Sequence, residues 1–149
     1  MKAEKLLKLA DFLDKLDDDK FWFGTVVNMW ERKEKNTCGT VCCAMGWTPQ
    51  VFPDEVGWRA PKNLGNQYDD ALYLKNTSDD ITNYDTIARK IFGISYDEVD
   101  FLFSPGDQED FLEKHGIETD IEDFTSSTSR EQVANNIRYF VENKIEGIF

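Results

Sequence analysis

The three cysteines of the chain lie close together, at Cys38, Cys42 and Cys43. A cysteine becomes a nucleophile when its pKa is lowered, for example at a helix N-terminus, and it then needs a base. The only histidine is His115, so a cysteine-dependent enzyme would use Cys38 or Cys42 with His115 as the base. His115 precedes Gly116, however, which is typical of a histidine at the end of a helix. Free cysteines are also among the most buried residue types. We therefore favour packing thiols and no catalytic residue, with the enzyme as an alternative.

The same thiols form an incomplete set of metal ligands. Cys38 and Cys42 are four residues apart and could share one helix face. Zinc needs further ligands, and on a helix Cys43 would point about 100° away from Cys42. The sequence has no second cysteine or histidine cluster and no match to a calcium-binding loop. It predicts no metal site and no cofactor.

The first part of the chain combines aromatic and basic residues. All four tryptophans precede residue 69. Trp47, Trp58, Arg59 and Lys62 could stack on, and pair with, a nucleotide-like small ligand. Tryptophans also bury much area, so the alternative, which we favour, is a core built partly from loops. A small-molecule ligand remains possible on this pattern.

Acidic residues dominate the middle of the chain. Residues 69–123 contain 16 acidic and 4 basic residues, so this segment alone accounts for the net charge of −12. A field of this sign repels nucleic acid and anionic membranes and attracts basic surfaces. We expect a host protein with a basic surface as partner, and neither direct nucleic-acid binding nor membrane binding. The candidate partner-binding surface is Asp97, Asp100, Asp107, Glu109 and Asp110.

Hydrophobic periodicity predicts mostly helices. They are expected over residues 2–16, 37–47, 82–92, 95–103, 109–115 and 129–145. The segment 21–30 is predicted as a strand or a buried extended stretch, 57–70 as a loop, and 71–74 as a short strand. These elements predict an α+β, mainly α fold: a single compact domain of five or six short helices with a minor strand or hairpin component.

Local signals set the helix boundaries. Capping boxes are expected at Ser95–Glu98 and Ser129–Gln132. Pro49 and Pro53 are expected to limit the helix over 37–47. In the last helix the predicted buried stripe is Val133, Ile137, Phe140, Val141 and Ile145.

We expect residues 1–149 to form one domain with three parts. These are an aromatic, mildly basic front (1–68), an acidic helical part (69–123) and a C-terminal helix (about 129–145). No stretch approaches the ~20 apolar residues of a membrane span, and the first residues do not match a signal peptide. An odd number of cysteines, two of them adjacent, argues for a reducing cytoplasm.

Two segments carry a resemblance to a known group of proteins. The first is Asn36–Trp47, which contains Cys38-Gly39-Thr40 and, further on, Cys43-Ala44-Met45-Gly46. The second runs from Phe92 to Phe103. Together they resemble small uncharacterised phage and bacterial proteins with a Cys-Gly-Thr-x-x-Cys-Ala-x-Gly segment. The resemblance implies a phage-associated protein of the host cytoplasm and implies no particular activity. With the charge pattern, it suggests an accessory protein that acts by binding, for example to inhibit a host defence or nucleic-acid-handling factor.

Overall fold

Helices make up most of the described chain, and one short hairpin completes it. The computed structural model describes residues 1–23, 43–59 and 72–149. Its elements are α1 (Ala3–Lys15), η1 (Asp18–Lys20), η4 (Met45–Trp47), α2 (Thr48–Val51), β1 (Val56–Trp58), β2 (Leu72–Leu74), α3 (Tyr84–Phe92), α4 (Tyr96–Phe103), α5 (Gln108–Lys114) and α6 (Arg130–Ile145). The predicted α+β, mainly α fold is confirmed.

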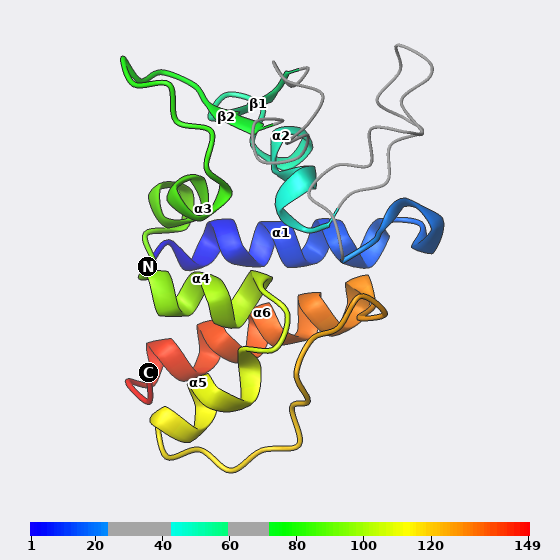
Figure 1. The fold of residues 1–149 in the computed structure, drawn as a ribbon, viewed down its shortest axis with the longest axis vertical. Helices are drawn as coiled ribbons and strands as arrows, with labels where there is room; N and C mark the ends of the chain where they lie inside the picture. The colour runs from blue at the N-terminus through cyan, green and yellow to red at the C-terminus, as the bar shows by residue number, and fades with distance from the viewer. Residues whose placement is uncertain (24–42, 60–71) are drawn as a thin grey trace.

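Helix α1 lies at the centre, with α2 and α3 on one side and α4 and α6 on the other (Figure 1). It pairs most extensively with α6, which runs in the opposite direction (Figure 1). Leu6, Leu9 and Leu13 recur at helical spacing and are fully buried. Arg130 of α6 donates from Nη1 to the carbonyl oxygens of Leu13 and Asp14, at 3.0 Å each. The Leu13 carbonyl also accepts the Leu16 N–H, so Arg130 adds a second bond there and caps the Asp14 carbonyl at the end of α1.

Helices α3, α4 and α5 follow one another through sharp turns. Gly93 ends α3 with φ 65°, a left-handed conformation that glycine adopts at little cost. Both predicted capping boxes are present: Ser95 with Glu98 begins α4, and Ser129 with Gln132 begins α6. These caps satisfy the first N–H groups of each helix.

The two-stranded hairpin packs over α2 (Figure 1). Strands β1 and β2 are antiparallel, with Gly57 opposite Tyr73. A Cβ atom at Gly57 would lie 2.4 Å from the Tyr73 ring, so the close approach of this ring requires glycine. The predicted strand over 71–74 is confirmed as β2, but Gly57 and Trp58 belong to β1 rather than to the predicted loop.

Two further expectations need correction. Pro49 does not limit the helical segment, which continues from η4 into α2. Proline is tolerated there because the first N–H groups of a helix lack intrahelical partners anyway. Ile145 is 69% exposed and lies outside the buried stripe of α6, whereas Val133 and Ile137 are buried as predicted. Residues 24–30 of the predicted strand and residues 37–42 of the predicted helix lie outside the described residues.

Within the described ranges, none of the helices has the length and apolar character that crossing a membrane would require.

Candidate functional site

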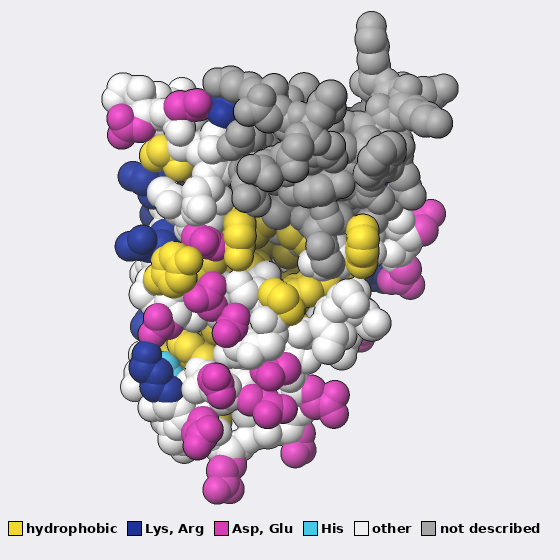
Figure 2. All heavy atoms as spheres, viewed as in Figure 1, with side chains coloured by type: hydrophobic (Ala, Val, Ile, Leu, Met, Phe, Trp, Pro, Cys, Tyr) yellow, Lys and Arg dark blue, Asp and Glu magenta, His cyan; other side chains and the backbone are white. Residues whose placement is uncertain are grey.

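Four of the five predicted acidic residues meet at a hollow between α4 and α5. Asp97 and Asp100 come from α4, and Asp107 and Asp110 come from the start of α5; Phe111 and Lys114 complete the lining. The hollow has a volume of about 220 Å³. Figure 2 shows Asp and Glu side chains gathered over the part of the surface where α5 and the segment after it lie. We call the group Asp97, Asp100, Asp107 and Asp110 the acidic hollow.

Asp100 lies at the centre of this charge group. Its pKa is raised by partial burial and by the negative charges of Asp107, Asp85 and Asp97. Ser104 donates from its hydroxyl to Asp100 Oδ1 at 3.0 Å, which partly offsets the rise. Among the described residues, no Lys, Arg or His forms an ion pair with Asp100, Asp107 or Asp110. A cation placed in the hollow would therefore relieve repulsion between like charges.

Asp97, at the rim, differs from Asp100 because it has a cation of its own. Lys114 Nζ lies 2.5 Å from Asp97 Oδ2. This hydrogen bond, together with the charge of Lys114, lowers the pKa of Asp97. Both side chains are exposed, so the pair contributes little to stability.

Tyr96 and Asp85 extend the acidic hollow toward α3. Tyr96 is 52% exposed and donates from its hydroxyl to Asp85 Oδ2 at 3.2 Å. Asp85 is only 9% exposed, and its Oδ1 has no hydrogen-bond partner. The charge of Asp85 is the largest cause of a raised pKa for Tyr96. Sequence reasoning missed both residues, although Tyr96 lies four positions before Asp100, on the same helix face.

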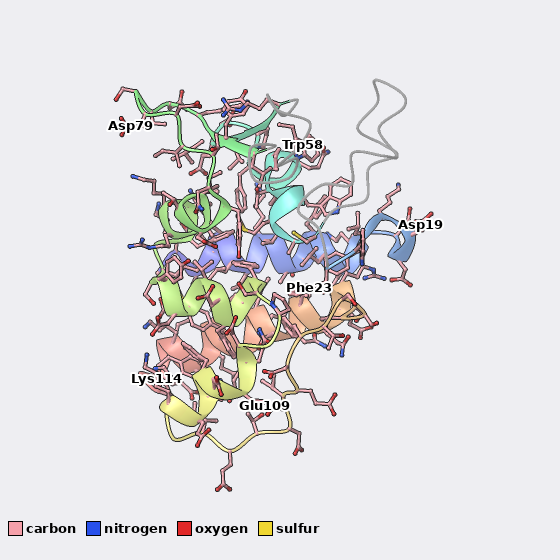
Figure 3. All side chains as sticks on the ribbon, in the orientation of Figure 1. Asp19, Phe23, Trp58, Asp79, Glu109 and Lys114 are labelled. Atoms are coloured by element: carbon pink, nitrogen blue, oxygen red, sulfur yellow. The ribbon has the colours of Figure 1, made fainter. Side chains whose placement is uncertain are left out.

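Glu109 does not join the acidic hollow. It lies on another face of α5, beside Glu113 and Glu118. Figure 3 shows Glu109 near the beginning of α5 and Lys114 at its end. The acids are close together in the sequence, but neighbouring residues of a helix point about 100° apart. Closeness in sequence therefore did not show that Glu109 and Asp110 face different sides of α5.

Trp47 and Trp58, two of the four tryptophans of the front, form hydrogen bonds within the fold. Trp47 is 4% exposed and donates from Nε1 to the Lys20 carbonyl at 3.1 Å. Trp58 donates from Nε1 to the Gly46 carbonyl at 2.9 Å, and the two indole rings meet edge to face at 6.1 Å. Figure 3 labels Trp58, the last residue of strand β1 of the hairpin. Trp47 therefore has no face on which a small ligand could stack, and it acts as a core residue.

Arg59 of the front contacts side chains of the acidic part of the chain. Its Nη1 lies 2.8 Å from Asp80 Oδ1, and its guanidinium lies 5.7 Å from the centre of the Tyr73 ring. Lys62, the fourth residue of the predicted ligand site, lies outside the described residues. In the described part of this site, the two tryptophans contact each other and Arg59 contacts Asp80 and Tyr73.

Of the residues predicted for a cysteine-dependent enzyme, only His115 lies within the described residues, since Cys38 and Cys42 lie outside them; the described cysteine is Cys43. His115 Nδ1 is 2.8 Å from the Phe111 carbonyl oxygen, and its ring packs on Phe111 at 4.4 Å. Cys43 occupies the second cysteine position of the Cys-Gly-Thr-x-x-Cys-Ala segment. Burial raises its pKa, which is the opposite of what a nucleophilic thiol needs.

No group of three or more His, Cys, Asp or Glu side chains within the described residues is arranged to hold a metal ion. The acidic hollow therefore offers charge without the converging ligand geometry of a cation site. It is suited to an ammonium or guanidinium group that is brought by a larger molecule.

Comparison of the chain with protein-family models, with curated proteins and with solved structures found no match.

Proposed function

We propose that this protein acts by binding a partner protein that presents a basic surface to the acidic hollow. The observation that carries the proposal is the meeting of Asp97, Asp100, Asp107 and Asp110 at one concave site. Partial burial, and after it repulsion from Asp107, Asp85 and Asp97, raises the pKa of Asp100 there. An incoming lysine or arginine would remove this repulsion, so binding would gain free energy that the free protein lacks.

The size of the hollow favours a protein side chain over a free ligand. Its volume of about 220 Å³ is below the roughly 300–1,000 Å³ typical of small-molecule sites. Tyr96, exposed beside it, offers an aromatic face on which a lysine or arginine can pack. An exposed aromatic residue among charges is a common anchor of protein interfaces.

The biological setting rests on the sequence resemblance. Similarity of the cysteine segment to phage and bacterial proteins supports a phage or prophage accessory protein that works in the host cytoplasm. A host defence factor or another protein that handles nucleic acid would present the basic surface that the acidic hollow requires, because such proteins bind phosphates.

Capture from a bacterial lysate at two salt concentrations tests the proposal. Capture is compared at about 0.1 M and about 1 M salt, between which the Debye length falls from about 10 to about 3 Å. We expect a basic protein to be captured at low salt and lost at high salt. Failure to capture any basic protein in a salt-dependent manner would contradict the proposal.

Two triple variants identify the surface that is responsible. The hollow variant carries Asp100→Asn, Asp107→Asn and Asp110→Asn. The control variant carries Asp19→Asn, Asp54→Asn and Glu146→Gln, three exposed residues elsewhere that change the net charge equally. The hollow variant should lose the partner while the control retains it. Equal loss in both would show that net charge, rather than this site, governs binding.

A further inference from the structure

Three basic residues gather beside the acidic hollow. Arg89 and Lys90 are exposed in the last turn of α3, and Lys2 is exposed directly before α1. Lys2 Nζ donates to the Lys90 carbonyl oxygen at 3.2 Å, which holds Lys2 at the end of α3. Among the described residues, none of the three forms an ion pair. We call Lys2, Arg89 and Lys90 the basic patch.

The packing of α3 on α4 brings the basic patch and the acidic hollow onto one face. Asp85 lies four residues before Arg89, on the same side of α3, and accepts a hydrogen bond from the Tyr96 hydroxyl at 3.2 Å. Tyr96 lies four residues before Asp100, on the same side of α4. Figure 2 shows Lys and Arg side chains along one edge of the face on which Asp and Glu side chains gather.

Electrostatics agree that Tyr96 lies between the two groups of charges. The charges of Asp85 and Asp100 raise the pKa of Tyr96, whereas the charge of Arg89 lowers it. Tyr96 is therefore close enough to respond to a member of the basic patch and to a member of the acidic hollow.

The two patches carry matching numbers of unpaired charges. In the acidic hollow, Asp97 pairs with Lys114, but Asp100, Asp107 and Asp110 have no ion pair among the described residues. Three unpaired carboxylates thus lie beside the three unpaired cations of the basic patch. Charges of opposite sign that share a face without pairing inside the chain are placed to pair between two chains.

A two-fold rotation about an axis near Tyr96 would set the basic patch of each copy against the acidic hollow of the other. Such an interface is self-complementary, because every contact occurs twice, and it closes as a dimer. Tyr96 is 52% exposed and would lie at the centre, where aromatic residues contribute most to protein interfaces.

The net charge of −12 does not prevent this contact at physiological salt. The Debye length is then about 8 Å, so charges outside the interface are largely screened from the other copy. Charges that meet in the interface are screened much less. The matching of the two patches, rather than the total charge, therefore decides whether two copies associate.

We propose that a second copy of this chain binds this face, so that the protein forms a two-fold dimer in which basic patch meets acidic hollow twice. The dimer does not depend on the partner protein proposed above. Both would occupy the acidic hollow, so a basic partner has to displace the second copy. Self-association would therefore restrict the hollow to partners that bind it more tightly than the second copy does.

Sedimentation of the purified chain tests the dimer. We expect dimers at about 0.15 M salt and monomers at about 1 M, because the Debye length falls from about 8 to about 3 Å. A monomer at about 0.15 M salt and at chain concentrations up to about 1 mM would overturn the proposal. A dimer that persists unchanged at about 1 M salt would also overturn it. No partner is present, so failure here leaves the capture experiment as a separate test of the proposed function.

Two charge-reversal variants identify the surfaces in contact. One carries Arg89→Glu with Lys90→Glu, and the other carries Asp107→Lys with Asp110→Lys. Each variant sets like charges against each other, so its dimer dissociation constant should rise at least about tenfold. A mixture of the two variants should form dimers, because the acidic face of one meets the basic face of the other. A mixture without dimers, or variants that dimerise singly as the unaltered chain does, would overturn the proposal.

The matched control is Asp19→Lys with Asp54→Lys, which changes the net charge as the second variant does, at two exposed positions outside both patches. Figure 3 shows Asp19 beyond the far end of α1 from the basic patch. The control should dimerise at least as strongly as the unaltered chain, and loss of its dimers would show that this face is not responsible. Should a reversal variant fail to fold, the salt dependence of the unaltered chain still decides the outcome.

Discussion

The aromatic front and the acidic hollow both contain polar side chains, but the fold uses them differently. In the front, the indole N–H groups of Trp47 and Trp58 donate to backbone carbonyls, and Arg59 pairs with Asp80. In the acidic hollow, Asp100, Asp107 and Asp110 have no ion pair among the described residues. Groups that stabilise the fold have found partners within it. In the hollow, Asp97 pairs with Lys114, but the other three carboxylates have no ion pair among the described residues, which is why we propose binding there.

The strongest test of this contrast is Trp47→Ala in the front. Trp47 is 4% exposed and packs against Phe12 and Trp58, so its removal leaves a large cavity. We expect the free energy of unfolding to fall by about 3–5 kcal/mol, measured by denaturant titration. The matched control is Trp22→Ala, because Trp22 is 45% exposed. It should change stability by no more than about 0.5 kcal/mol. If both variants lowered the free energy of unfolding by the same small amount, Trp47 would again be a candidate residue of the ligand site.

Within the acidic part of the chain, some acids stabilise the fold and others are available for binding. Replacing Glu98, an acid of the first kind, should lower the stability by less than Trp47→Ala does. Glu98, like Trp47 of the front, is buried and has partners within the fold. Its Oε1 lies 2.6 Å from Lys144 Nζ, and its Oε2 accepts a hydrogen bond from the Ser95 N–H. Burial opposes its ionisation, but these bonds outweigh that effect and lower its pKa. Glu98→Gln should therefore cost about 1–2 kcal/mol at neutral pH.

The pH dependence of Glu98→Gln follows from the sign of the shift. A lowered pKa stabilises the fold above the ordinary value of about 4.3 for glutamate. The difference between Glu98→Gln and the unaltered chain should shrink as pH falls through the lowered pKa. A difference that persists unchanged in acid would contradict the assignment of the Lys144 pairing.

The smallest expected effect has the opposite sign. The pKa of Asp100 is raised, so its ionised form destabilises the fold. Asp100→Asn keeps the acceptor for Ser104 and should stabilise the protein by about 0.5–1 kcal/mol at neutral pH. The gain should vanish below about pH 3.9, the ordinary pKa of aspartate, and grow as pH rises through the raised value. If Asp100→Asn instead lowered the stability, Asp100 would be an acid that stabilises the fold, as Glu98 is.

Local chemistry made part of the fold predictable. Ser95 and Ser129 precede Glu98 and Gln132 by three residues, and both capping boxes formed. Prediction was wrong where tertiary contacts decide. Trp58 is in a strand because β2 pairs with it, and Pro49 continues a helical segment because it falls in the first turn.

The candidate site was predicted in part. The density of acids along the sequence correctly indicated Asp97, Asp100, Asp107 and Asp110. It wrongly included Glu109, which lies on another face of α5. Tyr96 and Asp85 were missed, since their hydrogen bond depends on how α3 and α4 pack against each other.

Site-specific photo-crosslinking tests the central contrast most directly. Tyr96 at the acidic hollow and Trp22 in the front are both exposed aromatic residues, 52% and 45% exposed. Each is replaced in turn by p-benzoylphenylalanine, and the protein is irradiated in bacterial lysate at low salt. We predict that the probe at position 96 forms an adduct with a basic protein and that the probe at position 22 does not. An adduct with the same partner from position 22 alone would contradict the assignment of binding to the acidic hollow.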